Sequence, residues 1–360
     1  MFVGVVGLVI AAAYAANTLS YSDWNPTSLI RFGEGVHGHV DYAHRWLGED
    51  VIFTKRAGHD GKFFFVQAMD PFYLQPEEHA VHLDRPAYRS QRMLYPLLAS
   101  AGGLLAPMGI AWGLIVVNVF AIGLGTFATA RLAQDLGSSP WLGLAFTFNP
   151  GILHEMYIDG SGVLATAALM AGILFARRRR PWLSGGLLVA SVLSRETMIL
   201  AVLGLALFEW RRGKQLAWPI VVPPTVATGV WWVYLRLRVP DNVTQDLQAL
   251  DLPFAGFIRA MTGWIGQPDK EVDIMVAILI LLIAAYVVYR AWKTPTALNH
   301  AAAGIAVLAF VMSEPVWPYL DATRALSPVL TAFVLMVLTK EERAARVGGT
   351  TELVERVSVG

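Results

Sequence analysis

The chain has 360 residues, of which 55% are hydrophobic and only 15% are charged, and its mean hydropathy is +0.50. Soluble domains carry about a quarter charged residues, so this deficit and the repeated apolar runs place the chain among membrane proteins. The formal net charge of +1 gives no reason to expect nucleic acid as a partner. The absence of cysteine excludes disulfides, thiolate catalysis and cysteine-ligated metals.

Ten apolar segments predict membrane-spanning helices, because a helix needs about 20 predominantly apolar residues to cross a bilayer. In chain order they are residues 2–19, 110–131, 141–158, 160–176, 182–193, 197–210, 217–237, 272–292, 297–312 and 324–338. The first segment contains small residues suited to signal-peptide cleavage, but it lacks a basic start, so we favour a retained span. A further apolar run at 93–107 is short and is bounded by Pro96 and Pro107.

Four clusters of basic residues predict the side of the membrane that each loop faces, because cytoplasmic loops are enriched in Lys and Arg. The clusters lie at 177–180, 211–214, 290–293 and 340–346. If all four are cytoplasmic, the spans alternate correctly only when the run at 93–107 does not cross. We therefore expect that run to lie flat or re-entrant at the outer interface, and both termini to be cytoplasmic.

This assignment places the unusual polar segments together on the outer side of the membrane. They are residues 21–92, Asp159, 194–196, 242–271 and 314–323. We predict an all-α polytopic protein of about ten transmembrane helices plus a juxtamembrane helix, in the plasma membrane of a bacterium. Residues 1–340 would form one transmembrane domain, with an outer loop and juxtamembrane helices at 20–108, and residues 341–360 a cytoplasmic tail.

The segment at 21–92 holds six of the eight histidines and ten carboxylates. At its centre stands Gly58-His59-Asp60-Gly61-Lys62-Phe63-Phe64-Phe65. The glycines alone are typical of a turn, and the phenylalanines indicate that this turn is anchored to an apolar surface. A carboxyl group partly desolvated at a membrane interface has its pKa raised toward that of a useful base. Asp60 is therefore the candidate catalytic residue.

Arginines near the interfacial run and near the last span are candidate phosphate ligands. Arg89 and Arg92, with Tyr88, precede the run at 93–107. They suit either snorkelling toward lipid headgroups or a phosphate clamp, because a guanidinium group binds phosphate oxygens in a bidentate fork. Arg324 is a second candidate, although Asp321 stands three residues before it and can pair with it.

Two further pairs of charged residues stand at the ends of predicted spans. Glu155 and Asp159 are four residues apart, so they share one helical face if the helix continues that far; otherwise both lie in the outer water. Arg195 and Glu196 separate two short apolar runs. They either neutralise each other or leave Arg195 to contact an anionic ligand.

The histidines raise the question of a metal site. His37, His39, Asp41 and His44 are suitable metal ligands by residue type. No HExxH motif occurs, however, and solvent-exposed loop histidines are common. We therefore expect no cofactor, and a divalent metal is not favoured.

The layout resembles that of the superfamily C glycosyltransferases, polytopic enzymes that use polyprenyl-phosphate sugars. The shared order is one span, a long outer loop with an acid, an interfacial helix entered through arginine and proline, and then many spans. Many members have a Tyr-Asp-Gly or Trp-Asp element before aromatics in this loop, where the chain has 58–65, with His59 in place of the aromatic residue, and then 68–71. The family's arginine-bearing elements are resembled by residues 88–96, 194–197 and 321–328.

The resemblance implies transfer of a sugar from a polyprenyl-phosphate donor to a hydroxyl group of a glycan, lipid or protein acceptor. The transfer would occur on the outer face with inversion, and Asp60 would be the catalytic acid/base residue. The expected substrate-binding residues are His59, Asp70, Tyr88, Arg89, Arg92, Glu155, Asp159, Arg195, Glu196, Asp321 and Arg324. The alternative is a secondary transporter or a flippase for lipid-linked substrates. A transporter favours ionisable groups near mid-membrane and related halves, whereas here the charges gather at one face and we find no convincing repeat.

Overall fold

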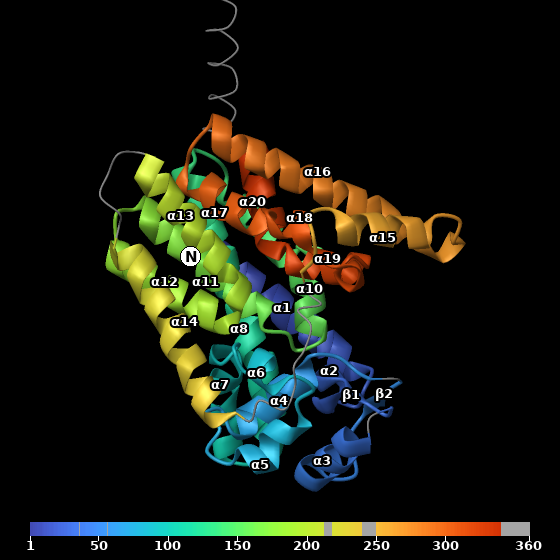
Figure 1. Ribbon diagram of the computed structural model, residues 1–360. Helices are drawn as coiled ribbons and strands as arrows, with labels where there is room; N and C mark the ends of the chain where they lie inside the picture. The colour runs from blue at the N-terminus through green and yellow to red at the C-terminus, as the bar shows by residue number, and fades with distance from the viewer. Residues whose placement is uncertain (36, 56, 212–217, 240–249, 340–360) are drawn as a thin grey trace, which may run out of the picture.

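The computed structural model describes residues 1–35, 37–55, 57–211, 218–239 and 250–339, and over these residues the protein is all-α. The exception is one parallel pair of two-residue strands, β1 (Phe32–Gly33) and β2 (Phe53–Thr54). Figure 1 shows a bundle of longer helices, the helical body, with a group of short elements at one end, the polar cap (residues 21–106). The predicted tail at 341–360 lies outside the described residues.

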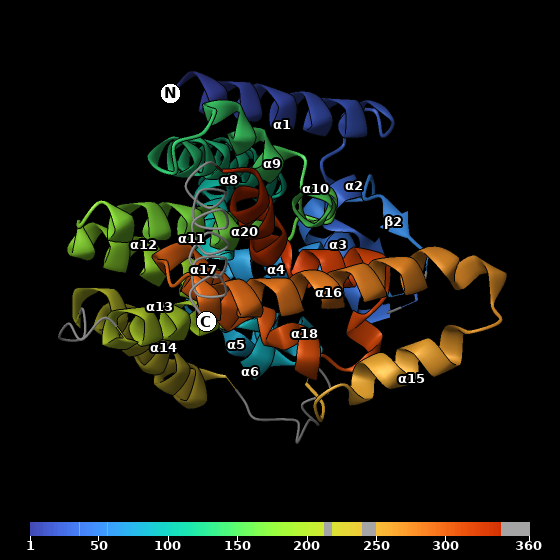
Figure 2. The same cartoon turned by 90° about the horizontal axis from the view of Figure 1, so that it is seen from above.

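The helical body is built around α11 (Gly162–Arg177), in which 12 of 16 residues are buried. Its many alanines allow close approach, and α8 and α12 pack against it. The other helices of the body surround these three, and α15 projects to one side (Figures 1 and 2). The bounds are α1 (Phe2–Ser20), α8 (Pro107–Asp135), α12 (Pro181–Ser194), α13 (Ile199–Arg211), α14 (Trp218–Arg238), α15 (Ala255–Trp264), α16 (Glu271–Lys293), α17 (Ala297–Ala306), α18 (Leu308–Val311), α19 (Tyr319–Ala325) and α20 (Ser327–Leu338).

The polar cap has an apolar core of its own, although it is the most hydrophilic part of the chain. Phe63, Phe64 and Phe65 are all buried in it, and the ring of Phe64 meets that of Tyr95 edge-on at 5.2 Å. This core continues onto α8 through Leu114, so the cap is fixed to the helical body. Its helices are α2 (Thr27–Ile30), α3 (His37–Leu47), α4 (Gly61–Met69), α5 (Pro76–His79), η1 (Ala80–His82), α6 (Pro86–Arg89), α7 (Leu94–Ser100) and η2 (Ala101–Leu104).

Fewer helices are long and apolar enough to cross a membrane than the ten expected. In the described part of the chain there are four, namely α1, α8, α14 and the continuous stretch Pro268–Lys293, and a fifth if α19 and α20 count as one span bent by 72°. Helices such as α11 and α12 are apolar but have only 16 and 14 residues. The hydropathy of a window measures composition, and it does not register where a proline or a capping side chain ends a helix.

The expected span at 141–158 shows this effect, because it is broken into η3 (Pro140–Gly143), α9 (Leu144–Thr147) and α10 (Pro150–Tyr157). At the break, the Asn149 side chain accepts a hydrogen bond from the Gly151 N–H at 2.9 Å and donates one to the Ser327 carbonyl oxygen at 2.8 Å. Pro150 at the first position of α10 suits a helix start. The expected interfacial run at 93–107 forms α7 and η2, a short apolar stretch of helix.

Candidate functional site

A pocket of about 340 Å³ lies where the polar cap meets the helical body. Its polar walls are charged, with five arginines against three carboxylates among the described residues. Asp60 and the residues around Arg89 come from the cap, Arg195 and Glu196 from the junction of α12 and α13, and Arg324 from α19. The lining residues are Asp60, Arg85, Tyr88, Arg89, Arg92, Arg195, Glu196, Thr197, Leu250, Leu308, Met312, Pro315, Val316, Asp321, Arg324 and Ala325.

Asp60 reaches this pocket because of the glycines beside it. Gly58 has a φ of +73°, and a Cβ atom there would clash with the Arg31 carbonyl oxygen. A Cβ atom on Gly61 would press on the backbone oxygens of Ile30 and Ile158. The glycines therefore have a structural explanation, as the turn interpretation requires, and the turn they form brings Asp60 to the pocket wall at the start of α4.

The carboxylate of Asp60 is held between two arginines. Its Oδ1 accepts a hydrogen bond from Arg89 Nη1 at 2.9 Å, and its Oδ2 accepts one from Arg324 Nη2 at 2.7 Å. Arg89 also makes a bidentate pair with Asp84 and lies 4.1 Å from the centre of the Phe63 ring. Residues 264 positions apart in the chain thus form one ion pair.

Glu155 links the other side of Arg324 to Arg195. Its Oε1 lies 2.9 Å from Arg195 Nη1 and 3.5 Å from Arg324 Nε, and its Oε2 accepts a hydrogen bond from the Gly162 N–H at 3.0 Å. A Cβ atom on Gly160 or Gly162 would overlap the Glu155 carboxylate, so both glycines make room for it. Both oxygens of the Glu155 carboxylate are therefore paired with groups of the protein itself.

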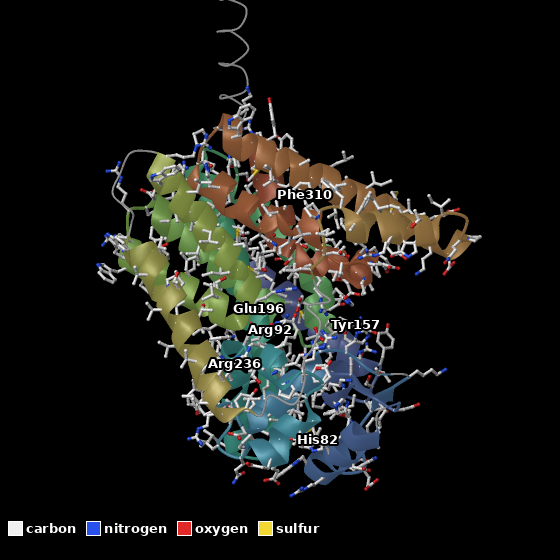
Figure 3. All side chains as sticks on the ribbon, viewed as in Figure 1. His82, Arg92, Tyr157, Glu196, Arg236 and Phe310 are labelled. Carbon is white, nitrogen blue, oxygen red and sulfur yellow. The ribbon has the colours of Figure 1, made fainter. Side chains whose placement is uncertain are left out.

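Arg92 and Glu196 form a third pair, visible at the centre of Figure 3. Two parallel hydrogen bonds of 2.9 Å join the Arg92 guanidinium to the Glu196 carboxylate, and Arg92 Nη2 also donates to the Tyr88 hydroxyl at 2.8 Å. Burial alone would raise the pKa of Glu196, but Arg92 outweighs it and lowers that pKa to about 2. Arg195 and Glu196 therefore do not neutralise each other, because each pairs with a residue far away in the sequence.

The expected direction of the Asp60 pKa shift is wrong. Burial alone would raise the pKa of this carboxyl group, as the sequence argument assumed. The nearby charges of Arg324, Arg89 and Arg92 outweigh burial and hold the pKa well below its usual range. With both arginines in place, Asp60 is an ionised carboxylate and a weak base.

Four expected site residues do not line the pocket. One is Glu155, whose carboxylate pairs with Arg195 and Arg324 as described above. Asp70 accepts backbone hydrogen bonds from Leu74 at 2.8 Å and Gln75 at 2.7 Å, so it stabilises the turn that leads into α5. Asp159 is fully buried, and neither of its side-chain oxygens has a hydrogen-bond partner among the described residues. His59 is exposed beside the pocket.

The Asp159 backbone also corrects a sequence inference. Helix α10 ends at Tyr157, and Asp159 has a φ of +48°, so Glu155 and Asp159 do not share a helical face. Burial raises the pKa of Asp159 well above its usual range, and Arg31 only partly opposes this effect. The side chain is therefore driven toward its neutral form, which lowers the free-energy penalty of its burial.

Among the described residues, no group of three or more histidines and carboxylates is arranged to hold a metal ion. In the set raised from the sequence, His39 Nε2 lies 2.7 Å from the His82 carbonyl oxygen, and His44 Nδ1 lies 3.2 Å from that of Gly48. Both rings thus pair within the polar cap. The side chain of His37 lies outside what the structure describes.

Several residues that shape the site were not predicted from the sequence. Gly160 and Gly162 follow Asp159 within three residues, yet their close fit to Glu155 is a packing feature without a sequence signal. Asp84 pairs with Arg89 five residues later, a spacing that the sequence does show. His154 lies on α10, and its ring centre is 6.4 Å from that of His59. The apolar wall formed by Leu308 and Met312 belongs to a segment that hydropathy assigns to a span.

No protein-family model matches this sequence, and no curated protein matches it either. The function must therefore be argued from the geometry and electrostatics of the pocket. The pocket combines an acid, several arginines that converge from separate parts of the chain, and an apolar wall. Such a set is suited to an anionic ligand that also has an apolar part.

Proposed function

We propose that the chain is a membrane glycosyltransferase that moves a sugar from a polyprenyl-phosphate donor to a hydroxyl acceptor on the outer face, with inversion. The observation that supports this most is the meeting of Asp60, Arg89 and Arg324 in one pocket. A carboxylate to accept a proton and guanidinium groups to bind a leaving phosphate are the two requirements of such a transfer.

The arginines give the donor phosphate its binding site. Arg89, Arg92, Arg195 and Arg324 are each paired with a carboxylate, so a phosphate group binds them by taking the place of a carboxylate. Arginine binds phosphate oxygens with the same fork that it uses for carboxylates. A donor phosphate therefore competes with Asp60 for Arg89 and Arg324, and it replaces one set of ion pairs by another.

This exchange also prepares the base. Once a phosphate takes Arg89 and Arg324, the charges that lower the pKa of Asp60 are partly neutralised, and that pKa rises. The oxygen of the acceptor hydroxyl then attacks the anomeric carbon from the face opposite the phosphate, and Asp60 removes the proton of that hydroxyl. The bond from the anomeric carbon to the phosphate oxygen breaks, and the lipid phosphate leaves as an anion stabilised by the arginines.

The lipid part of the donor fits the position of the pocket. Leu308, Met312 and Val316 form an apolar wall, which suits a donor that enters sideways from the bilayer. In this proposal about ten segments cross the plasma membrane of a bacterium, with both termini in the cytoplasm, and the short apolar helices cross together with the long ones. No cofactor is required by these steps.

Transfer from a labelled polyprenyl-phosphate sugar, measured in nanodiscs without an ion gradient, tests the proposal. We expect product from the wild type and almost none from Asp60→Asn. Asp41→Asn is the matched control, because Asp41 is an exposed carboxylate of the same cap on α3 and does not line the pocket. Counterflow uptake in proteoliposomes without any transfer product would instead support a secondary transporter or flippase.

A further inference from the structure

A second pocket, of about 410 Å³, lies between α13, α16 and α17. Its walls are almost entirely apolar, and among the described residues its two charged or ionisable lining residues are Arg211 and His300. Figure 1 shows these helices at the end of the helical body remote from the polar cap, so this pocket is separate from the one that contains Asp60. The proposed sugar transfer does not use it.

The floor of this pocket is close-packed backbone. A Cβ atom on Gly204 of α13 would clash with the His300 carbonyl oxygen, and one on Gly304 of α17 would clash with that of Leu200. The two helices are therefore in contact through glycines on both sides. The hollow beside this contact lies against fixed backbone, so neighbouring side chains do not easily close it.

His300 is buried at this pocket with unused hydrogen-bonding capacity. The residue lines the pocket and is only 2% exposed. Nδ1 lies 3.2 Å from the Thr296 carbonyl oxygen, so Nδ1 carries the proton and donates it. Nε2 is then an acceptor, and it has no hydrogen-bond partner among the described residues. A hydroxyl group of a ligand is one donor that would pair with this nitrogen.

The entrance of the pocket combines apolar exposure with a positive charge. Leu203, Leu207 and Trp292 line the pocket and are 55%, 46% and 64% exposed, so it opens on the apolar outside of the body. Arg211, at the C-terminal end of α13, is exposed at the same pocket. A hydrocarbon chain in the slot would thus have a negative head group within reach of a guanidinium.

We propose that this pocket binds one anionic phospholipid whose head group has a free hydroxyl, as in phosphatidylglycerol. The acyl chain fills the apolar slot between α13, α16 and α17, and the phosphate pairs with Arg211. A head-group hydroxyl donates a hydrogen bond to His300 Nε2. Charge at the entrance and an unpaired acceptor inside together favour this lipid over a zwitterionic lipid or a lipid without a hydroxyl.

Native mass spectrometry of the full chain in detergent tests the proposal with three lipids of equal chain length. Phosphatidylglycerol has both the charge and the hydroxyl, phosphatidylmethanol has only the charge, and phosphatidylcholine is zwitterionic. We expect the wild type to retain phosphatidylglycerol about tenfold better than phosphatidylcholine, with phosphatidylmethanol between them. Equal retention of phosphatidylglycerol and phosphatidylcholine would overturn the proposal.

Variants separate the two polar contacts. Arg211→Gln should weaken both anionic lipids about tenfold, whereas His300→Phe, which keeps a ring to pack against Phe208, should remove only the advantage of phosphatidylglycerol over phosphatidylmethanol. Arg180→Gln is the control, because Arg180 is an exposed arginine outside the pocket. If Arg180→Gln weakened retention of the anionic lipids as much as Arg211→Gln does, the effect would be one of general surface charge, and the site would be rejected.

A filled pocket provides the remaining test. Ala303→Trp places an indole in the slot, and we expect it to abolish retention of all three lipids while the thermal unfolding temperature remains near that of the wild type. Full retention by this variant would reject the pocket as the binding site. Because no sugar donor is present, these results are independent of the proposed glycosyl transfer.

Discussion

Replacement of Asp60 by Asn should change donor binding and turnover in opposite directions. The substitution keeps the shape of the side chain and removes its negative charge. Arg324 keeps Glu155 at 3.5 Å and Asp321 at 3.8 Å, and Arg89 keeps Asp84. The arginines therefore remain paired and in place, and the variant is expected to fold.

The expected gain in donor affinity follows from the two hydrogen bonds that Asp60 makes to Arg89 and Arg324 and that the variant loses. A hydrogen bond to a charged group contributes about 1.5–3 kcal/mol, but the side chains involved are 16–18% exposed, which reduces the gain. If removal of the competing carboxylate makes the binding free energy of the donor more favourable by about 1.4 kcal/mol, the affinity for the donor rises about tenfold. Loss of the general base should at the same time lower kcat by about 10²–10⁴.

Two measurements on one preparation test this reasoning. Titration with an unlabelled polyprenyl phosphate gives the affinity of the anion, and single-turnover transfer from the labelled donor gives the rate of the chemical step. Asp41→Asn should leave both at wild-type values. Weaker anion binding by Asp60→Asn would refute the exchange of carboxylate for phosphate, and wild-type turnover would refute the role of Asp60 as base.

Three other predictions concern the framework of the site. Arg92→Met should lower the free energy of unfolding by about 2–3 kcal/mol, because it leaves Glu196 without its partner. The double variant Arg92→Met with Glu196→Gln should recover part of that loss. A double-mutant cycle of thermal unfolding would measure both effects. Because the folded-state pKa of Glu196 is lowered to about 2, its contribution to stability is present above its usual pKa of 4.5 and is lost as the pH falls toward 2. The unfolding temperatures of the wild type and Glu196→Gln should thus differ by a constant amount above about pH 5 and converge below it, and convergence at higher pH would contradict this. Gly58→Ala should destabilise by at least about 1 kcal/mol more than Gly48→Ala in chemical unfolding, because both have positive φ but only Gly58 has an atom in the way.

The sequence was informative about which charged residues lie together. Counting basic clusters placed Asp60, Arg195 and Arg324 on one side of a membrane, and the structure brings all three to one pocket. This inference needed only the alternation of helices, which depends on composition. The pairing within the pocket depends on side-chain geometry, so the sequence left open whether Arg195 pairs with Glu196 or with another residue, and the structure pairs it with Glu155.

The number of spans and the roles of some acids were harder to predict, for local reasons. Asn149 and Pro150 end one helix and begin another inside a predominantly apolar stretch, so hydropathy predicted one long helix there. Asp70 follows the expected catalytic motif closely in sequence, but its carboxylate accepts two backbone hydrogen bonds in the turn before α5. Turns and catalytic sites use the same residue types, and only the partners distinguish them.

The pKa of Asp60 shows why the sign of an electrostatic effect can depend on a distant residue. Its neighbours in sequence imply burial, and burial alone raises the pKa of a carboxyl group. The largest opposing charge comes from Arg324, which lies 264 positions away, and together with Arg89 and Arg92 it reverses the shift. The basicity of Asp60 is therefore set by whatever occupies Arg324 and Arg89. In the proposed enzyme, a bound donor phosphate would raise that basicity, so that the acceptor hydroxyl loses its proton only when a sugar is in place to receive the attack.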